Sequence, residues 1–379
     1  MMQIKDSFFK LILMVFYHSK FKFQVNYGDF NPKRTDPYFL IGNHASLHDG
    51  LYTATFLKRY PYPVINAFMF IHKSMKFVLK RLIYSIPKRK GQSDISTIME
   101  MMKVVKKGRG IMLFPEGNSS YFGKESQIPY ATVKLFKKFK IDVVICKTNG
   151  AYLSAPRWGD KSTHKGLMQL NFKVLFKAEE LENYSLDEMY DILTKEMAFN
   201  DFDWNKQRKY LYKPKYRALG LENYIYVCPK CLSHQTISTN KNDIQCNRCG
   251  KIAHFNQYSL IEGLDFDNLV DWDLLQKRQL PNILKEEVHS QGLMYLVDTM
   301  KYKSYKLGHV KTKIDKGSLF AKTDKETYHF NILDISGLTL TKKNEVSFDY
   351  DQKTYLFVLK DPMLYVDLIH YIKENKGNG

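Results

Sequence analysis

The sequence predicts an α/β protein in which a mostly parallel central sheet, flanked by helices, is followed by two smaller modules. Three observations support this fold class. Short apolar runs alternate with helix-like segments up to about residue 205. Two close pairs of cysteines follow. From about Tyr305 the apolar period changes to two, which is typical of β-strands. A chain of 379 residues is long enough for two or three domains.

The first apolar run, residues 8–17, predicts an N-terminal helix. It holds about half of the roughly 20 residues that a membrane-spanning helix needs, and Lys10 interrupts it. No small-residue cleavage site follows, which argues against a signal peptide. We expect residues 1–20 to lie in a membrane interface, because one side carries the apolar residues Phe8, Leu11, Ile12 and Val15. The alternative is a core helix packed on the sheet.

An acid–base pair follows the predicted buried strand 38–41. His44 and Asp49 are five residues apart, and in one regular helix they would point about 140° away from each other. They can meet if His44 lies in a loop and Ser46 with Asp49 forms a capping box that opens a helix over 51–57. A helix N-terminus beside His44 keeps its imidazole neutral and basic. The alternative is that Asp49 only caps the helix and His44 is a polar turn residue.

A second short motif, Phe114-Pro115-Glu116-Gly117, ends the apolar run 110–114. Glu116 therefore lies at the carboxyl end of a strand, the edge where parallel α/β sheets bind ligands. The alternative is a plain surface turn.

The remaining elements complete an α/β domain over residues 21–205. Amphipathic patterns predict helices over 97–107 and 130–138, and an acidic helix over 185–198. Apolar runs predict strands over 141–146 and 170–176, and Cys146 in the first of these is expected in the core. Residues 206–222, which include Pro214, read as a basic linker.

The two motifs together resemble the glycerophospholipid acyltransferases of the PlsC-like family. This resemblance implies that His44 is the general base, that Asp49 is its partner, and that Glu116 and Gly117 bind a glycerol-phosphate acceptor. Arg89 matches the family's arginine that contacts the acceptor phosphate. Neighbouring Lys88 and Lys90 either share that work or are solvated surface.

The chain departs from the family pattern at several positions, which leaves the acceptor's identity open. Ser85 replaces a usual glycine, and Lys88 stands where an acidic residue is common. After the second motif the chain reads Asn118-Ser119-Ser120 in place of Thr-Arg-Ser. The strand 141–146 lacks the family's prolines.

The resemblance implies an O-acyltransferase that needs no catalytic metal. It would move a fatty acyl group from an acyl carrier protein or coenzyme A thioester to the sn-2 hydroxyl of 1-acyl-glycerol 3-phosphate, forming phosphatidic acid. Another lysophospholipid acceptor remains an alternative. A hydrolase would need its own nucleophile, and although Ser46 is nearby, the sequence has no G-x-S-x-G elbow.

Beyond the linker, residues 223–254 contain two C-x2-C pairs separated by fourteen residues, which is close to zinc-ribbon spacing. Four thiolates complete the tetrahedral coordination of Zn²⁺ and leave no open position, so we expect one structural zinc. Two disulfides are the alternative, but nothing in the sequence suggests secretion. The four expected ligands are Cys228, Cys231, Cys246 and Cys249.

The last two segments are a helical connector over 255–300 and a β-rich domain over 301–379. Trp272 is the expected apolar anchor of the connector. Five strands and a closing helix that begins at Pro362 resemble a pleckstrin-homology or GRAM-type domain, by pattern alone. A plain α+β dimerisation domain is the alternative. The five strands are expected over 317–323, 326–332, 337–341, 345–350 and 353–359.

The charge of the chain is concentrated in its first part. Residues 1–150 hold 25 Lys/Arg and 9 Asp/Glu, and so contribute +16 to a net charge of +19. This surface would attract anionic lipid headgroups and an acidic lysophospholipid. We therefore expect a cytoplasmic enzyme bound peripherally to the inner face of the membrane. A zinc-ribbon protein that binds nucleic acid is a further alternative, but no recognised nucleic-acid module is present and most of the charge lies far from the cysteines.

Overall fold

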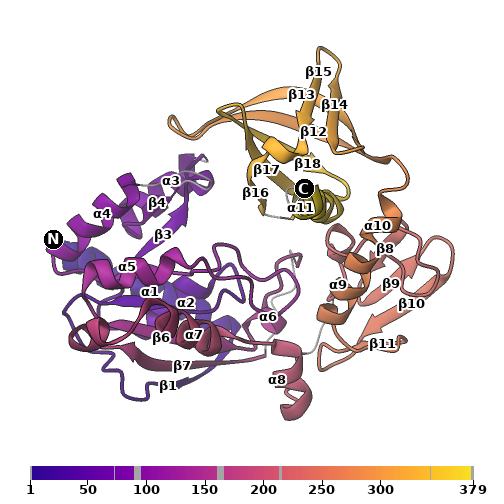
Figure 1. The fold of residues 1–379 in the computed structure, drawn as a ribbon. Helices are drawn as coiled ribbons and strands as arrows, with labels where there is room; N and C mark the ends of the chain where they lie inside the picture. Colours follow the sequence, from indigo (N-terminus) through magenta and orange to yellow (C-terminus); the bar gives the residue numbers. More distant parts are fainter. Residues whose placement is uncertain are drawn as a thin grey trace.

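The computed structural model describes residues 2–71, 73–88, 95–159, 166–212, 216–341 and 343–376. Within these ranges the chain forms a seven-stranded sheet, a four-stranded sheet and a second seven-stranded sheet in sequence order (Figure 1). The predicted fold class is confirmed: a mostly parallel sheet with helices precedes a small antiparallel sheet and a curled antiparallel sheet.

The first sheet is mixed but mostly parallel. Its strand order is β1-β7-β6-β2-β5-β3-β4, in which β2 is parallel to β5 and β6 while β7 runs antiparallel to β6. All three residues of β2 are buried because helices or loops cover both faces. The bounds are β1 Lys22–Asn26, β2 Phe39–Ile41, β3 Tyr62–Asn66, β4 Ile86–Lys88, β5 Ile111–Leu113, β6 Val143–Asn149 and β7 Leu167–Phe176.

The predicted helices of this domain are confirmed at 97–107, 130–138 and 185–198, with ends that differ by one or two residues. Ser185 and Glu188 form the capping box of the last one, α7. The domain's helices are α2 Asp49–Thr55, α3 Lys73–Phe77, α4 Ile95–Lys106, α5 Ala131–Phe139, α6 Ala151–Ser154, α7 Leu186–Met197 and α8 Asp201–Arg208. Two 3₁₀-helical segments, η1 Ala67–Phe70 and η3 Ala178–Asn183, and one π-helical segment, η2 Val78–Leu82, also belong to this domain.

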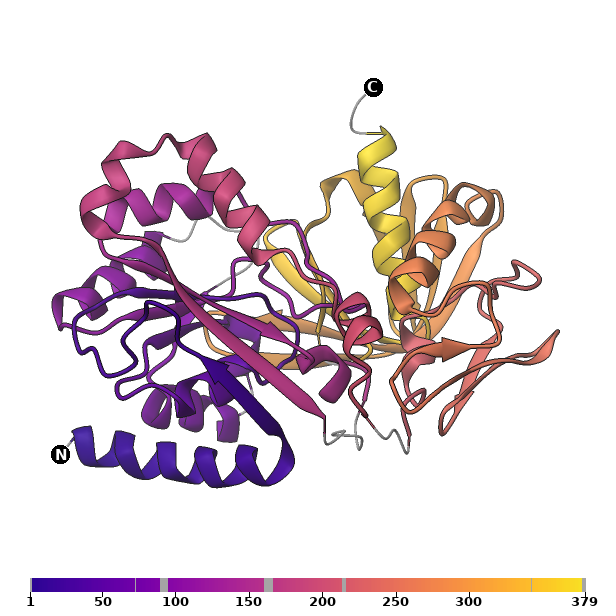
Figure 2. The same cartoon turned by 90° about the horizontal axis from the view of Figure 1, so that it is seen from below.

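Helix α1, Met2–Lys20, lies along the outside of this domain (Figure 2). Tyr17 is buried where α1 packs on α2, and its ring meets that of Tyr52 edge-on at 6.1 Å. The opposite side is open: Leu11, Ile12 and Val15 are 50%, 49% and 63% exposed. α1 thus combines a packed side with an exposed apolar side. Among the described helices, none has the length and apolar character to span a bilayer.

The region expected as a basic linker is partly structured. Helix α8 continues past the predicted boundary and ends at Arg208. Arg217 is fully buried, and its guanidinium donates to the carbonyl of Leu153 in α6. Burial lowers the pKa of Arg217 to about 10. The backbone N–H of Arg217 donates to the side-chain oxygen of Asn242, and that of Ala218 donates to the carbonyl of Lys241, in a turn of the next sheet. This segment therefore ties the first domain to the cysteine module.

The small sheet has the order β11-β10-β9-β8. Its strands are β8 Ile237–Asn240, β9 Asp243–Cys246, β10 Gly250–Phe255 and β11 Ile261–Glu262. Helices α9, Leu269–Arg278, and α10, Leu280–Ile283, follow. Trp272 is fully buried and its indole N–H donates to the carbonyl of Val227 at 2.9 Å, as expected of an anchor.

The prediction of a helical connector over 255–300 is wrong for the last part of that range. Val288–Asp298 forms strand β12, which pairs with both β13 and β18. Its sequence reads as neither a clean helix nor a clean strand, because Gly292 and polar residues interrupt the apolar pattern. Hydrogen-bonded pairing with β13 on one side and β18 on the other makes this segment a strand.

The last sheet has the order β15-β14-β13-β12-β18-β17-β16 and is curled around helix α11 (Figure 1). The five predicted strands and the closing helix are confirmed, and the apolar face of the helix, which includes Leu364 and Leu368, is buried. The elements are β13 Lys303–Asp315, β14 Ser318–Thr323, β15 Thr327–Asn331, η5 Ile332–Asp334, β16 Ser336–Thr341, β17 Glu345–Tyr350, β18 Lys353–Leu359 and α11 Pro362–Lys376.

Candidate functional site

The loop between β2 and α2 carries His44 at the carboxyl edge of the parallel strands. Asn43 fixes this loop, because its side chain exchanges two 2.7 Å hydrogen bonds with the backbone of Thr148 in β6. Gly42 is required by packing: a Cβ there would lie 2.6 Å from the carbonyl oxygen of Cys146. Cys146 is buried, as predicted, and burial raises its pKa to about 12.

His44 and Asp49 meet. The imidazole Nδ1 lies 3.0 Å from Asp49 Oδ2. The Asp49 side chain is 1% exposed and the His44 side chain 18% exposed. Because the buried carboxylate accepts from Nδ1, the lone pair of the neutral ring lies on Nε2, the nitrogen that a substrate hydroxyl needs. The His44 ring also stacks on Phe114, with centroids 4.5 Å apart.

Asp49 is held by more than His44. Its Oδ2 accepts from the backbone N–H of Ser46 at 2.9 Å, and its Oδ1 accepts from the hydroxyl of Tyr52. The carboxylate therefore binds the Ser46 backbone and the histidine at once. The predicted capping box is only half formed, because the N-cap of α2 is His48 and its side chain makes no capping bond, and the helix spans Asp49–Thr55 and not 51–57. The Asp49 oxygens are turned toward three donors, which fixes the carboxylate in one orientation.

Tyr52 was not identified from the sequence. It lies three residues after Asp49 on α2, and residues at this spacing share a helix face. That spacing is the signal that would have identified it. Tyr52 is fully buried, and burial together with Asp49 raises its pKa well above the usual value. It remains a hydrogen-bond donor to Asp49 throughout the physiological pH range.

Glu116 follows β5 and bonds to the backbone of the same loop. Its Oε1 accepts from the N–H of His44 and its Oε2 from the N–H of Ser126, each at 2.8 Å. The residue is 8% exposed. Burial raises the pKa of Glu116 to about 7, although the two backbone hydrogen bonds act in the opposite direction. Both oxygens are occupied by backbone donors, so Glu116 ties residues 44 and 126 together.

Gly117 and Ser120 lie in the loop that follows Glu116, and Ser120 makes a second backbone contact with His44. Gly117 has φ +72°, a left-handed conformation that favours glycine, and space for a Cβ is open. Ser120 donates its backbone N–H to the carbonyl oxygen of His44 at 2.6 Å. His44 is therefore bonded through its main chain to Glu116 on one side and to Ser120 on the other.

The structure brings together His44, Asp49, Glu116 and Gly117 but does not describe Arg89. Arg89 and Lys90 lie outside the described residues. Lys88 is the last residue of β4, which is parallel to β3, and its side chain is exposed. β4 therefore ends at the same edge of the sheet that carries His44 and Glu116.

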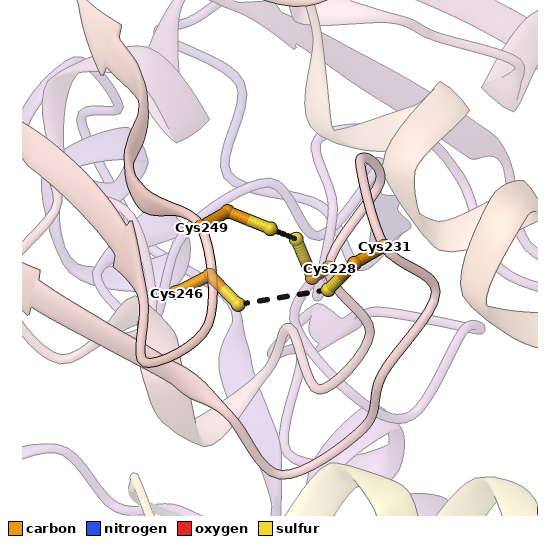
Figure 3. Close-up of side chains that lie close together, drawn as sticks. All are labelled: Cys228, Cys231, Cys246 and Cys249. Carbon is orange, nitrogen blue, oxygen red and sulfur yellow. Dashed lines mark hydrogen bonds between the residues drawn. The ribbon is translucent and has the colours of Figure 1, made fainter.

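The four cysteines form a second cluster (Figure 3). All four sulfur atoms lie within 4.8 Å of one another, with Cys228 and Cys249 3.9 Å apart and Cys231 and Cys246 3.8 Å apart. A disulfide would need about 2.05 Å. Sulfurs around a tetrahedral Zn²⁺, with bonds of about 2.3 Å, are separated by about 3.8 Å. The cluster therefore fits a four-coordinate metal site, with two ligands buried and two exposed.

Comparisons with known proteins find a family match for the first domain. Residues 24–146 match the family model described as Acyltransferase. A search of curated proteins found no match. The matched range begins in β1 and ends in β6, and it includes His44, Asp49 and Glu116.

Two solved structures are similar to parts of the chain. One is the 1-acyl-sn-glycerophosphate acyltransferase PlsC from Thermotoga maritima, with 14% identity over 54% of this chain and 78% of that protein, at a TM-score of 0.41. The other is Inner Membrane Complex sub-compartment protein 3 from Toxoplasma gondii, with 12% identity over 27% of this chain and 87% of that protein, at a TM-score of 0.20. Scores this low support no conclusion. The family match and the motif residues that lie within it show that the first half of this chain contains a domain of the acyltransferase family.

Proposed function

We propose that this domain transfers a fatty acyl group from a thioester to the sn-2 hydroxyl of 1-acyl-glycerol 3-phosphate, with phosphatidic acid as the product. The observation that carries the proposal is the buried Asp49 carboxylate, which binds Nδ1 of a partly exposed His44 and leaves Nε2 turned away from Asp49. An alcohol attacks a thioester slowly at neutral pH without a base, and this pair supplies one.

In the proposed reaction, His44 Nε2 takes the proton of the acceptor hydroxyl while the hydroxyl oxygen forms a bond to the thioester carbonyl carbon. Asp49 stabilises the imidazolium that results. The tetrahedral intermediate then expels the thiolate, and the imidazolium returns the proton to sulfur. No covalent acyl-enzyme is formed. The step is balanced, since the ester bond replaces the thioester bond and the thiol leaves.

The acceptor and donor are proposed from the family resemblance. Arg89 would contact the acceptor phosphate, since a guanidinium binds phosphate with two parallel hydrogen bonds. Gly117, directly after Glu116, has open space where a Cβ would lie. Glu116 is proposed to act on the acceptor indirectly, through the loop that it holds. The donor is an acyl carrier protein or coenzyme A thioester, and another lysophospholipid is the second candidate acceptor.

We also propose that the four cysteines hold one structural zinc. The sulfur spacing supports this, and the backbone N–H of Arg248 lies 3.4 Å from Cys246 Sγ, a contact that stabilises a thiolate. Because four protein ligands fill the coordination shell, the metal would contribute folding energy and no chemistry.

Helix α1 is proposed to hold the enzyme on the inner face of an anionic membrane. Its exposed Leu11, Ile12 and Val15 provide apolar area, and the basic first part of the chain adds attraction to the lipid headgroups. Changing these three residues to serine leaves Tyr17 and the packed side of α1 in place. The triple variant should bind anionic vesicles less than the wild type, and unchanged binding would point to another anchor.

For the C-terminal domain we propose the pleckstrin-homology or GRAM-type architecture. Seven antiparallel strands in one curled sheet, with a single helix at the end of the chain, support this proposal.

The test of the proposed function is acyl transfer by the purified full chain against a panel of lysolipids, with both thioester donors. Product formation with lysophosphatidate supports the proposal, and preference for another lysolipid selects the second candidate. A chain that forms no ester with any of them, and that shifts with nucleic acid in a salt-dependent way, would overturn it.

A further inference from the structure

Arg157 is a buried cation whose described hydrogen bonds reach two domains. It is 6% exposed. Its Nη1 donates to the carbonyl and hydroxyl oxygens of Ser119, at 2.9 and 3.1 Å, and its Nη2 donates to the carbonyl of Leu340 in β16. Its guanidinium also lies over the ring of Tyr121, 4.6 Å from the centroid. Burying a guanidinium is costly, so these hydrogen bonds must be retained for the charge to stay in place.

Strand β16 makes further contacts with the same segment. Thr339 donates its hydroxyl to the side-chain oxygen of Asn118 at 3.0 Å. The hydroxyl of Tyr121 lies 3.4 Å from the carbonyl of Leu340. Residues 118–121, which follow the Phe114–Gly117 motif directly, are thus bonded to a strand more than 200 residues later in the chain. We call Arg157, Thr339 and Leu340 the clamp.

The clamped segment also positions His44. Ser120 lies within it and bonds to the carbonyl of His44.

The C-terminal sheet also contacts the first domain at a second place. Tyr302, in the turn between β12 and β13, has its ring 5.6 Å from that of Phe70. The ammonium groups of Lys76 and Lys80 lie 4.7 and 5.2 Å from its centroid. Figure 1 shows this turn above α3. Tyr302 has φ +54°, which is unfavourable for a bulky residue, so the position is kept at some cost.

We propose that the C-terminal sheet completes the acceptor side of the acyltransferase site, with Arg157 as the positioning residue that holds residues 118–121 against His44. This inference rests on the proposed function, because it assigns the clamp to acceptor binding. The residues that Tyr302 contacts precede β4 in the chain, so the sheet contacts a second segment of the acyltransferase domain.

The experiment uses the full chain and the variants Arg157→Gln and Arg157→Lys. Arg278→Gln, at an exposed arginine near the end of α9, is the matched control. We measure KM for the lysolipid, KM for the thioester, kcat, and amide hydrogen exchange of residues 114–127. Arg157→Gln should raise the lysolipid KM on the order of tenfold, since it removes charged hydrogen bonds, while the thioester KM changes little. Exchange should accelerate in 114–127, and Arg157→Lys should recover part of both.

Two milder variants keep the proposal testable if Arg157→Gln does not fold. Thr339→Val removes one bond of the clamp. Tyr302→Asn removes the ring but suits the left-handed backbone, so the turn itself is not weakened. Both variants should raise the lysolipid KM, by less than Arg157→Gln does.

The outcomes distinguish a failure of the clamp proposal from a failure of the proposed acyltransferase function. Exchange of 114–127 and a lysolipid KM that match those of Arg278→Gln would overturn the clamp. An equal rise in both KM values, or faster exchange throughout the chain, would also overturn it, because that indicates general destabilisation. If the wild type shows no transfer, the proposed function fails, and hydrogen exchange alone still decides whether the clamp holds the segment.

Discussion

The proposed acyltransferase site and the four-cysteine cluster are assembled in different ways. The cysteines come from two pairs that lie close in sequence, and their sulfurs gather within 4.8 Å through local turns. The site instead joins two strand ends, and the bond from His44 to Glu116 spans 72 residues. The comparison indicates that the cysteine cluster forms from residues close in the chain, whereas His44 depends on contacts between remote segments.

The largest expected effect is on stability, in the cysteine cluster. Cys228→Ser should lose the metal and unfold the middle of the chain, because structural zinc sites carry about 10 kcal/mol or more of apparent binding free energy in small modules. Val227 beside it bonds to Trp272, so α9 should loosen too. Metal analysis and thermal unfolding measure this. A purified wild type with almost no zinc and with disulfide-bonded cysteines would contradict it.

His44→Ala should reduce activity and leave stability unchanged. General-base catalysis is typically worth about 10² to 10⁴ in rate, so turnover should fall by that factor while the thermal midpoint and membrane binding stay near wild type. Single-turnover assays and circular dichroism check the two parts. Near-normal transfer by this variant, or an acylated serine or cysteine trapped on the protein, would show that the mechanism is different.

Glu116 should make activity and stability respond to pH in opposite directions. Because its pKa is raised from 4.5 to about 7, its contribution to stability is fully present below about pH 4.5 and is lost as pH rises through 7. Activity should fall as pH drops through 7, since a protonated carboxyl accepts one of its two backbone bonds less well.

Glu116→Gln is the control for this pH effect. Its amide NH₂ cannot accept from a backbone N–H, so one buried donor loses its partner and transfer should fall on the order of tenfold. The acid side of the kcat/KM profile should be less steep in Glu116→Gln than in the wild type. Identical slopes would exclude a role for Glu116 in the pH dependence.

The smallest expected effect is that of Tyr52→Phe. The hydroxyl is one of three donors to Asp49, so its loss should cost about 1 kcal/mol, or several-fold in kcat, with little change in the lysolipid KM. Unchanged kcat would mean that Ser46 and His44 alone orient the carboxylate.

The sequence by itself determined what short-range patterns encode. Short apolar runs located the strands around β2, β5 and β6, because buried parallel strands are continuously apolar. The five-residue spacing of His44 and Asp49 and the cysteine pairs located both clusters. These features depend on residues close in the chain, so they are visible without the fold.

Only the tertiary structure decided how distant segments use these residues. Glu116 bonds to the backbone of the His44 loop, and Arg157 binds a carbonyl 183 residues away. β12 was missed because pairing on both sides, and not its own pattern, makes it a strand. Arg217 reads as a basic linker residue but is buried. In each case the deciding energy comes from desolvation and hydrogen bonds between remote segments, which no local spacing records.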